Sequence, residues 1–190
     1  MNWLAHLLLS ELSPEFRIGN LLPDILGHAE LAALPEKFQY GIRQHFRIDA
    51  FTDSHPVVKQ SVRRISPQFR RYAGVLVDVF YDHILARDWD SHTVVSLEDF
   101  AASVYSSFDA CRSDIPLKAL SVFERMRSGD WLCSYRQADG IRLTLNRLDL
   151  RLKRPAALGR AVEELEFHYT KFQADFTAFF PDLRARVAVP

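Results

Sequence analysis

The feature that most constrains this chain is a stretch of twelve residues, 75–86, which is apolar on every side yet carries three ionisable groups. Nine of its residues are apolar, and a helix that is apolar all round is a buried helix. Asp78 and Asp82 are four residues apart and share a face of that helix, and His83 follows directly. Buried carboxylates are stable only when they are paired, protonated or bound to a metal ion. Because the stretch contains no Lys or Arg, the compensating charge must come from another part of the fold.

A second segment supplies a matching set of polar side chains. His45, Asp49 and Asp53 follow one another at spacings of four, so all three share one face if the segment is helical. Two helices that each present carboxylate and imidazole groups can enclose a divalent metal ion, and these donors suit Mn²⁺, Fe²⁺, Zn²⁺ or Mg²⁺ according to geometry. The alternative is a network of ion pairs in which Arg43 and Arg47 neutralise the acids.

Composition and charge limit the class of protein. With 190 residues, 48% of them hydrophobic, the chain is long enough for one well-packed domain, which we expect to span residues 1–190. The formal net charge is zero, which provides no general attraction to nucleic acids or membranes. Cys111 and Cys133 match no metal or redox spacing, which favours a reducing, cytoplasmic setting. No segment resembles a signal peptide or a membrane-spanning helix, and nothing in the sequence specifies an oligomeric state.

The order of apolar and helix-breaking residues predicts an all-α chain, folded as a single compact multi-helix bundle. The side chain of Asn2 can cap the first helix, and the turn-like pairs Gly19-Asn20 and Leu22-Pro23 place Asp24 just after a break. The expected helices cover residues 2–12, 36–54, 72–89, 96–112, 116–127, 131–150 and 158–179, and the basic segment 57–71 is a helix or loop broken at Pro67.

Other ionisable residues extend the candidate site. His6 lies on an apolar helix, where a lone histidine is more often packed and hydrogen-bonded than ligating, and only the other candidates raise the ligand role to an equal alternative. Asp24 is a candidate ligand, general base or helix N-terminal carboxylate. The whole candidate set is His6, Asp24, His45, Asp49, Asp53, Asp78, Asp82 and His83. Clustered carboxylates repel one another unless cations lie between them, so we expect one or two metal ions, which favour phosphoester hydrolysis. A di-iron oxidation site is disfavoured because the sequence lacks Glu-x-x-His pairs.

Several short motifs occur in a characteristic order. They are Asn2-Trp3-Leu4-Ala5-His6-Leu7, Gly19-Asn20-Leu21-Leu22 with Asp24, the segment 45–53, the segment 78–83 with Trp89, and His168-Tyr169. In this combination the chain resembles the bacterial acyl carrier protein phosphodiesterases over nearly its whole length. The resemblance implies hydrolysis of the phosphodiester that links 4′-phosphopantetheine to a serine of holo-acyl carrier protein. It also implies a divalent metal, Mn²⁺ with Mg²⁺ or Fe²⁺ as alternatives, and a distant kinship to the all-α HD phosphohydrolases. One departure is that the adjacent pair here is Asp82-His83, the reverse of the His-Asp pair that names that superfamily.

From spacing and resemblance together we expect a metal-activated water to attack phosphorus. The predicted metal ligands are His6, Asp24, His45, Asp49, Asp78, Asp82 and His83. Asp24 is also a predicted catalytic residue, together with His83, which protonates the leaving serine oxygen or assists the water, and Arg47, which balances phosphate charge. Arg63, Arg64, Arg147 and Arg151 are expected to dock the acidic carrier protein. His168 is expected to contact either phosphate or a residue that itself binds the metal.

Three alternatives stay open at this level. The basic segments can be ordinary solvated surface, and the enzyme can be an HD-like phosphohydrolase that acts on nucleotides. The chain can also be a non-enzymatic all-α interaction module, in which arginines pair with the acids. Such a module would contain no stoichiometric metal.

Overall fold

The structure of this protein is a computed structural model that describes residues 1–188. All regular elements in that range are helices, and it contains no strand. The α-helices are α1 (Trp3–Leu8), α2 (Pro14–Leu21), α3 (His28–Ala32), α4 (Gln39–Ser54), α5 (Pro56–Arg64), α6 (Ala73–Arg87), α7 (Leu97–Ala110), α8 (Leu117–Ser128), α9 (Trp131–Ser134), α10 (Ala138–Asp149) and α11 (Val162–Val187). Short 3₁₀ segments are η1 (Leu22–Asp24), η2 (Glu36–Phe38), η3 (Pro67–Tyr72), η4 (Trp89–Ser91) and η5 (Leu158–Ala161). The all-α prediction is therefore confirmed.

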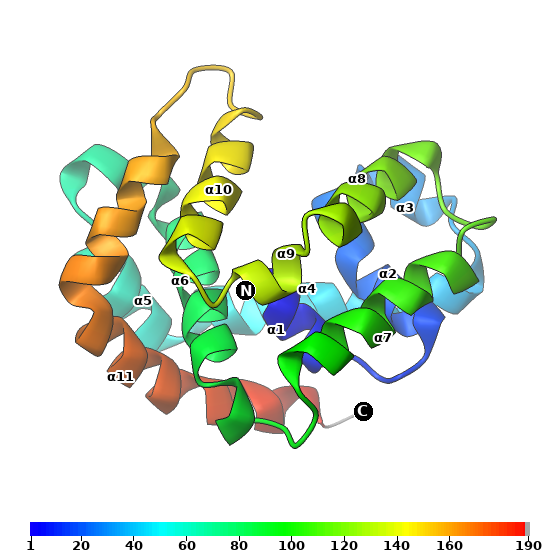
Figure 1. Cartoon of the computed structure of the whole chain (residues 1–190), viewed down its shortest axis with the longest axis horizontal. Helices are drawn as coiled ribbons and strands as arrows, with labels where there is room; N and C mark the ends of the chain where they lie inside the picture. Colours follow the sequence, from blue (N-terminus) through cyan, green and yellow to red (C-terminus); the bar gives the residue numbers. More distant parts are fainter. Residues whose placement is uncertain (189–190) are drawn as a thin grey trace.

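The N-terminal segment lies at the middle of the molecule (Figure 1). Helices α5, α6, α10 and α11 gather at one end, and α2, α3, α7 and α8 gather at the other, with α1, α4 and α9 between them (Figure 1). Helix α1 contacts both α2 and α6, and α4 contacts both α2 and α11. Side chains of α1 and α4 can therefore meet groups from both ends of the fold.

The apolar stretch that dominates the sequence lies in α6, which packs against α1, α5, α10 and α11. Its large side chains, among them Leu76, Phe80 and Ile84, are fully buried. This confirms the prediction of a buried helix. Burial around the whole circumference follows from the neighbouring helices, which leave α6 no continuous solvent face.

A close crossing of α2 and α4 fixes the position of the candidate site. A Cβ atom on Gly19 would lie 2.3 Å from a carbonyl oxygen of the facing segment, and one on Gly41 would lie 2.1 Å from another. Only glycine fits where two backbones approach this closely. The expectation of a turn at Gly19-Asn20 is wrong, because both residues lie inside α2. The two glycines instead allow the helices to pack closely, and this crossing places His45 within hydrogen-bonding distance of the Asn20 backbone.

Several helices differ in extent from the sequence expectation. The first ends at Leu8 instead of residue 12, and the expected helix 131–150 is divided into α9 and α10. Helix α11 has a kink at His168, where φ is −109° and ψ is 16°. The predicted break at Pro67 is present between α5 and η3. Among residues 1–188, no helix combines the length and the apolar character that crossing a membrane requires.

Candidate functional site

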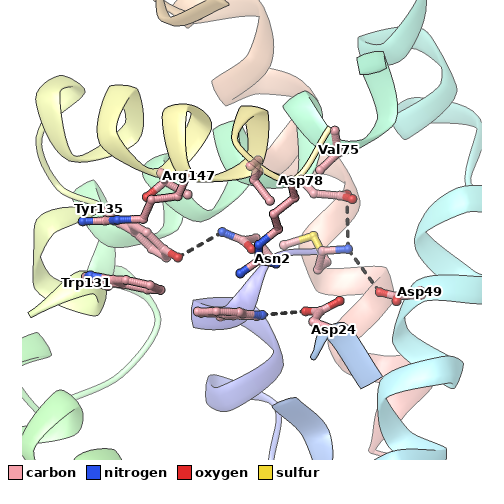
Figure 2. A pocket seen from close by; sticks show the side chains of 13 residues that line it. Asn2, Asp24, Asp49, Val75, Asp78, Trp131, Tyr135 and Arg147 are labelled. Carbon is pink, nitrogen blue, oxygen red and sulfur yellow. Dashed lines mark hydrogen bonds and ion pairs between the residues drawn. The ribbon is translucent and has the colours of Figure 1, made fainter. Parts of the chain in front are cut away.

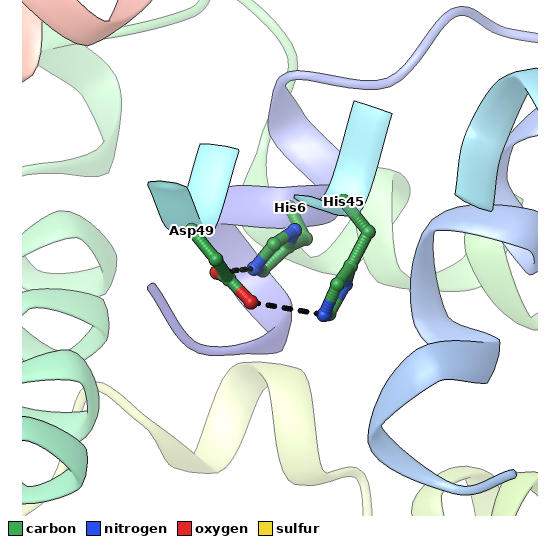
Figure 3. A group of neighbouring side chains, drawn as sticks. All are labelled: His6, His45 and Asp49. Carbon is green, nitrogen blue, oxygen red and sulfur yellow. Dashed lines mark hydrogen bonds and ion pairs between the residues drawn. The ribbon is translucent and has the colours of Figure 1, made fainter. Parts of the chain in front are cut away.

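Two histidines and one aspartate meet between α1 and α4 (Figure 3). His6 comes from α1, and His45 and Asp49 are one turn apart on α4. The two imidazole rings are stacked, with centroids 4.2 Å apart. Asp49 bridges them, because its Oδ1 lies 3.1 Å from His6 Nε2 and its Oδ2 lies 3.0 Å from His45 Nε2. One ligand-type atom from each residue lies within 4.8 Å of the others, so the three side chains can converge on one metal ion.

Asn20 holds both imidazoles in one orientation. His6 Nδ1 lies 3.0 Å from Asn20 Oδ1, and His45 Nδ1 lies 2.8 Å from the Asn20 carbonyl oxygen. Both oxygens are acceptors, so each Nδ1 carries the proton and donates it. Metal-binding histidines are commonly fixed in this way through the nitrogen that does not bind the metal. This role of Asn20 was not predicted from the sequence, although the residue stands in one of the motifs that carry the family resemblance.

Asp24 borders the cluster at the end of η1. Its Oδ2 accepts a hydrogen bond from Trp3 Nε1 at 2.6 Å, and its Oδ1 lies 3.8 Å from His45 Nε2. The break predicted before Asp24 is present as the 3₁₀ segment that contains Leu22 and Pro23. The indole therefore orients one carboxylate oxygen and leaves the other directed at the cluster.

Asp78 and Asp49 of this cluster both contact the same cation, the N-terminal ammonium group (Figure 2). The Met1 ammonium nitrogen lies 3.2 Å from Asp78 Oδ1 and 3.4 Å from Asp49 Oδ1. The apolar stretch requires a compensating charge from another part of the fold, and this ammonium supplies it for Asp78. The arrangement shows that a positive charge is accommodated between these two carboxylates.

Burial and neighbouring charges shift the protonation of these groups. Burial alone would raise the pKa of Asp49, but hydrogen bonds with the two histidines outweigh it and hold that pKa far below its ordinary value. Burial alone would lower the pKa of His45, but the hydrogen bond to Asp49 and the charge of Asp24 outweigh it and raise that pKa. Burial raises the pKa of Asp78, with the charge of Asp49 acting in the same direction and the nearby ammonium opposing it. Asp49 is thus a firmly ionised group at the centre of the cluster.

Asp82 differs from Asp78 in its partners. Its Oδ2 accepts a hydrogen bond from the Leu4 N–H at 2.7 Å, and its Oδ1 accepts one from the Ala5 N–H at 3.1 Å. These amides belong to the first turn of α1, where N–H groups lack intrahelical partners, so Asp82 caps α1 from α6. Asn2 forms no capping bond and donates to the Tyr135 hydroxyl instead. The structure therefore corrects one expectation, because the cap of α1 comes from Asp82 and not from Asn2. The carboxylate of Asp82, a predicted metal ligand, accepts both hydrogen bonds from the backbone of α1.

The acidic cluster opens into a cavity of about 160 Å³ (Figure 2). The lining includes Asp24, Asp49 and Asp78 together with Arg147 and Arg151, which come from the region of α10. The two arginines had been expected on a docking surface. The structure instead brings them into the same cavity as the carboxylates.

Two predicted catalytic residues, and one carboxylate of the candidate set, do not line this cavity. His83 Nδ1 lies 2.7 Å from the Tyr135 carbonyl oxygen, and its ring lines a different hollow together with Arg87. Arg47 lines a third hollow, and its Nη2 lies 3.5 Å from the Arg186 carbonyl oxygen. Asp53 is exposed at the end of α4. These placements depart from the expected cluster.

The remaining predicted binding residues are also outside the cavity. Arg64 Nη1 lies 2.6 Å from Asp175 Oδ2, in an ion pair that leaves 13% of the arginine side chain exposed. Its charge is neutralised within the fold, which argues against the expected docking role. Arg63 is exposed on α5. His168 lies at the kink of α11, with its ring 6.2 Å from that of Phe172.

The donor set fits a divalent transition metal. Two imidazole nitrogens with one carboxylate suit Fe²⁺, Mn²⁺ and Zn²⁺ better than Mg²⁺, which prefers oxygen ligands. The hydrogen bonds that the two imidazoles donate to Asn20 supply the outer-sphere orientation that such sites require. Asp24 and Asp78 add carboxylates at the border of the cluster. The arrangement can therefore hold a metal ion beside a cavity that also presents cationic side chains.

Comparison with known proteins gives a consistent result. A family model described as acyl carrier protein phosphodiesterase matches residues 1–183. A protein of that name from Enterobacter sp. (strain 638) is 34% identical over 182 residues, which is 95% of this chain and 94% of the relative. Proteins of that name from Pectobacterium atrosepticum (31% over 182 residues, 95% and 94%) and Escherichia coli O157:H7 (31% over 189 residues, 99% and 98%) are also similar. No solved structure matches the chain.

Proposed function

Since this chain belongs to the acyl carrier protein phosphodiesterase family, we propose that its cavity is the site of phosphodiester hydrolysis on holo-acyl carrier protein. The bond that breaks joins the phosphate of 4′-phosphopantetheine to a serine oxygen of the carrier protein. Water adds to phosphorus, and the products are apo-carrier protein and 4′-phosphopantetheine. The observation that carries the location is the meeting of His6, His45 and Asp49 beside a cavity that also contains arginines.

The proposed ligands of the metal are His6, His45 and Asp49, with Asp24 and Asp78 as further carboxylates for the same ion or a second one. Mn²⁺ is the proposed ion and Fe²⁺ the alternative, because the imidazole nitrogens disfavour Mg²⁺. When bound, a divalent ion acidifies water and neutralises charge on phosphate oxygens. Asn20 keeps both Nε2 atoms directed at the ion, and Trp3 fixes the carboxylate of Asp24, which we propose as a ligand or as the acceptor of a proton from water.

The carrier protein is proposed to reach the cavity past Arg151, which is exposed and lines the cavity. A cation at that point favours an acidic protein substrate and mainly affects its association rate. The distant relation to the HD phosphohydrolases and a single domain over residues 1–190 also belong to this proposal. They are supported by the all-helical fold and by a cluster of histidine and aspartate.

The proposal is tested by comparing Asp49→Asn with Asp53→Asn. The two residues are one turn apart on α4, but only the first contacts the histidines, whereas the second is exposed. We expect Asp49→Asn to lose stoichiometric metal and to reduce release of 4′-phosphopantetheine by on the order of 10³-fold. Asp53→Asn should retain both properties.

The measurements are elemental analysis of the purified variants and mass measurement of holo-carrier protein after incubation with enzyme and Mn²⁺. A wild-type enzyme that leaves the prosthetic arm in place but hydrolyses nucleotides would overturn the substrate assignment. Equal metal content in both variants would overturn the ligand assignment.

A further inference from the structure

Two buried polar atoms on one face of α10 have no hydrogen-bonding partner in the described part of the chain. They are Thr144 Oγ1 and Arg147 Nη1, and both residues line the cavity. The residues are three positions apart, so their side chains lie on the same side of the helix. Thr144 is only 8% exposed. A buried polar group without a partner lowers stability, and an oxygen atom of a ligand bound in the cavity would supply the missing partner.

The guanidinium of Arg147 is held in a defined plane. The guanidinium carbon of Arg147, Cζ, lies 4.1 Å from the centroid of the Trp131 ring. That ring stacks on the Trp3 ring, with the two centroids 5.7 Å apart and an angle of 11° between the ring planes. Trp3 in turn donates to Asp24. This column of rings links Arg147 to Asp24 (Figure 2). Stacking leaves the edge of the guanidinium, which carries its N–H donors, free to contact a planar or tetrahedral anion.

The charges around the cavity favour an anion once a dication is bound. Three carboxylates in the lining, those of Asp24, Asp49 and Asp78, are balanced by the Met1 ammonium and by the guanidinium groups of two arginines. The lining is therefore formally neutral before any metal is added. A divalent ion on the acidic side would make it positive, and a phosphodiester carries one negative charge.

We propose that Thr144 and Arg147 form a binding subsite for the phosphate oxygens of the substrate that face away from the metal ligands. The inference deepens the proposed function and rests on it. Thr144 donates its hydroxyl proton, and Arg147 donates from Nη1, to non-bridging oxygens of the phosphate. Arg147 thereby acts on the reacting group, whereas its sequence context had suggested only a surface for docking the carrier protein.

The first test compares Arg147→Ala with Arg154→Ala. Both remove one positive charge from the same basic region, but Arg154 is exposed and does not line the cavity. Binding of inorganic phosphate to the Mn²⁺-loaded enzyme is measured by calorimetry, and KM and kcat are measured with holo-carrier protein. Arg147→Ala should weaken phosphate binding about 10- to 100-fold and lower kcat/KM by a similar factor. Arg154→Ala should bind phosphate as the wild type does.

The second test uses Thr144→Val, which keeps the shape of the side chain and removes the hydroxyl. Phosphate binding should weaken by about 3- to 10-fold, while the melting temperature of the metal-loaded enzyme stays the same or rises, because an unpartnered buried polar group has been removed. A lower melting temperature with unchanged phosphate affinity would assign the hydroxyl to the fold and overturn the subsite.

Failure of the subsite and failure of the proposed function give different results. A wild-type enzyme that binds no phosphate, or equal phosphate affinity in Arg147→Ala and Arg154→Ala, overturns the subsite whatever the substrate is. A wild-type enzyme that binds phosphate in an Arg147-dependent manner, but does not release the arm from holo-carrier protein, supports the subsite and overturns the substrate assignment.

Discussion

At the scale of single residues, the site depends on an amide as much as on the imidazoles and carboxylates. Asn20 accepts from His6 through its side chain and from His45 through its backbone, and its Nδ2 donates to the His6 carbonyl oxygen and to Ser10 Oγ. The residue is fully buried. One side chain therefore ties α1 to α2, and the backbone of the same residue ties α2 to α4.

Replacing Asn20 by Ala should lower metal affinity by about 10- to 100-fold, because His6 loses the acceptor that fixes its tautomer and ring orientation. The affinity for Mn²⁺ can be measured by calorimetry. Ser10→Ala is the matched control, since it removes another partner of Asn20 without touching an imidazole. If both variants bind Mn²⁺ as the wild type does, the orienting role of Asn20 is wrong.

A second residue-scale prediction concerns Asp82 and pH. Burial raises its pKa to about 7 in the folded state, from an ordinary value of 3.8. Between these values the folded protein binds a proton that the unfolded chain has released, so the free energy of unfolding falls as pH rises. In metal-free enzyme this contribution should decrease by about 2 to 3 kcal/mol between pH 5 and pH 7.5.

Asp82→Asn removes that titration and keeps a side-chain oxygen that can accept from α1. Urea unfolding at the two pH values should therefore show a flatter dependence in the variant, and elemental analysis should show its metal content unchanged. Loss of the metal from this variant would restore Asp82 as a ligand. An identical pH dependence in variant and wild type would show that another group titrates.

At the scale of elements, helical periodicity predicted more than loop chemistry did. The spacing of four correctly placed His45 and Asp49 on one face of α4, because that relation depends only on local geometry. The spacing could not show that this face of α4 contacts α1 only over the turn from His45 to Asp49. Asp53, one turn further along, is exposed. Likewise, Asp78 and Asp82 share a face of α6, but one meets an ammonium and the other meets the first turn of α1. Which neighbour each turn meets is decided by tertiary packing.

The crossing of α2 and α4 can be tested with a pair of glycine substitutions. Gly41→Ala should destabilise the protein by about 2 kcal/mol or more, since the added Cβ would lie 2.1 Å from a backbone carbonyl oxygen. It should also weaken Mn²⁺ binding, because His45 lies one turn further along the same helix. Gly74→Ala meets nothing within 4 Å in the first turn of α6, and we expect it to stabilise by up to about 1 kcal/mol. Urea unfolding measures both, and equal effects would contradict the close crossing.

At the scale of the whole molecule, the cavity brings together charges that the sequence keeps far apart. The carboxylates come from η1, α4 and α6, whereas the arginine side chains come from the region of α10. Both groups are recognisable in the sequence, but the arginines were expected to dock the carrier protein, because a cluster of cations along the chain looks the same whether it faces solvent or a cavity. The orphaned hydroxyl of Thr144 carried no sequence signal at all, since its meaning depends on what surrounds it.

The same assembly predicts a link between metal binding and global stability. Residues proposed to hold the ion come from α1, η1, α4 and α6, and the unfolded chain cannot present them together. Mn²⁺ at 100 times its dissociation constant should therefore stabilise the folded state by about 2.7 kcal/mol, which corresponds to a rise in melting temperature of roughly 5 to 10 °C for a chain of this size. Asp49→Asn should lose this rise, whereas Asp53→Asn should keep it. Mg²⁺ at the same concentration should produce a smaller rise, because two of the proposed ligands are imidazoles. A rise of equal size in both variants would mean that the stabilising ion binds somewhere other than between α1 and α4.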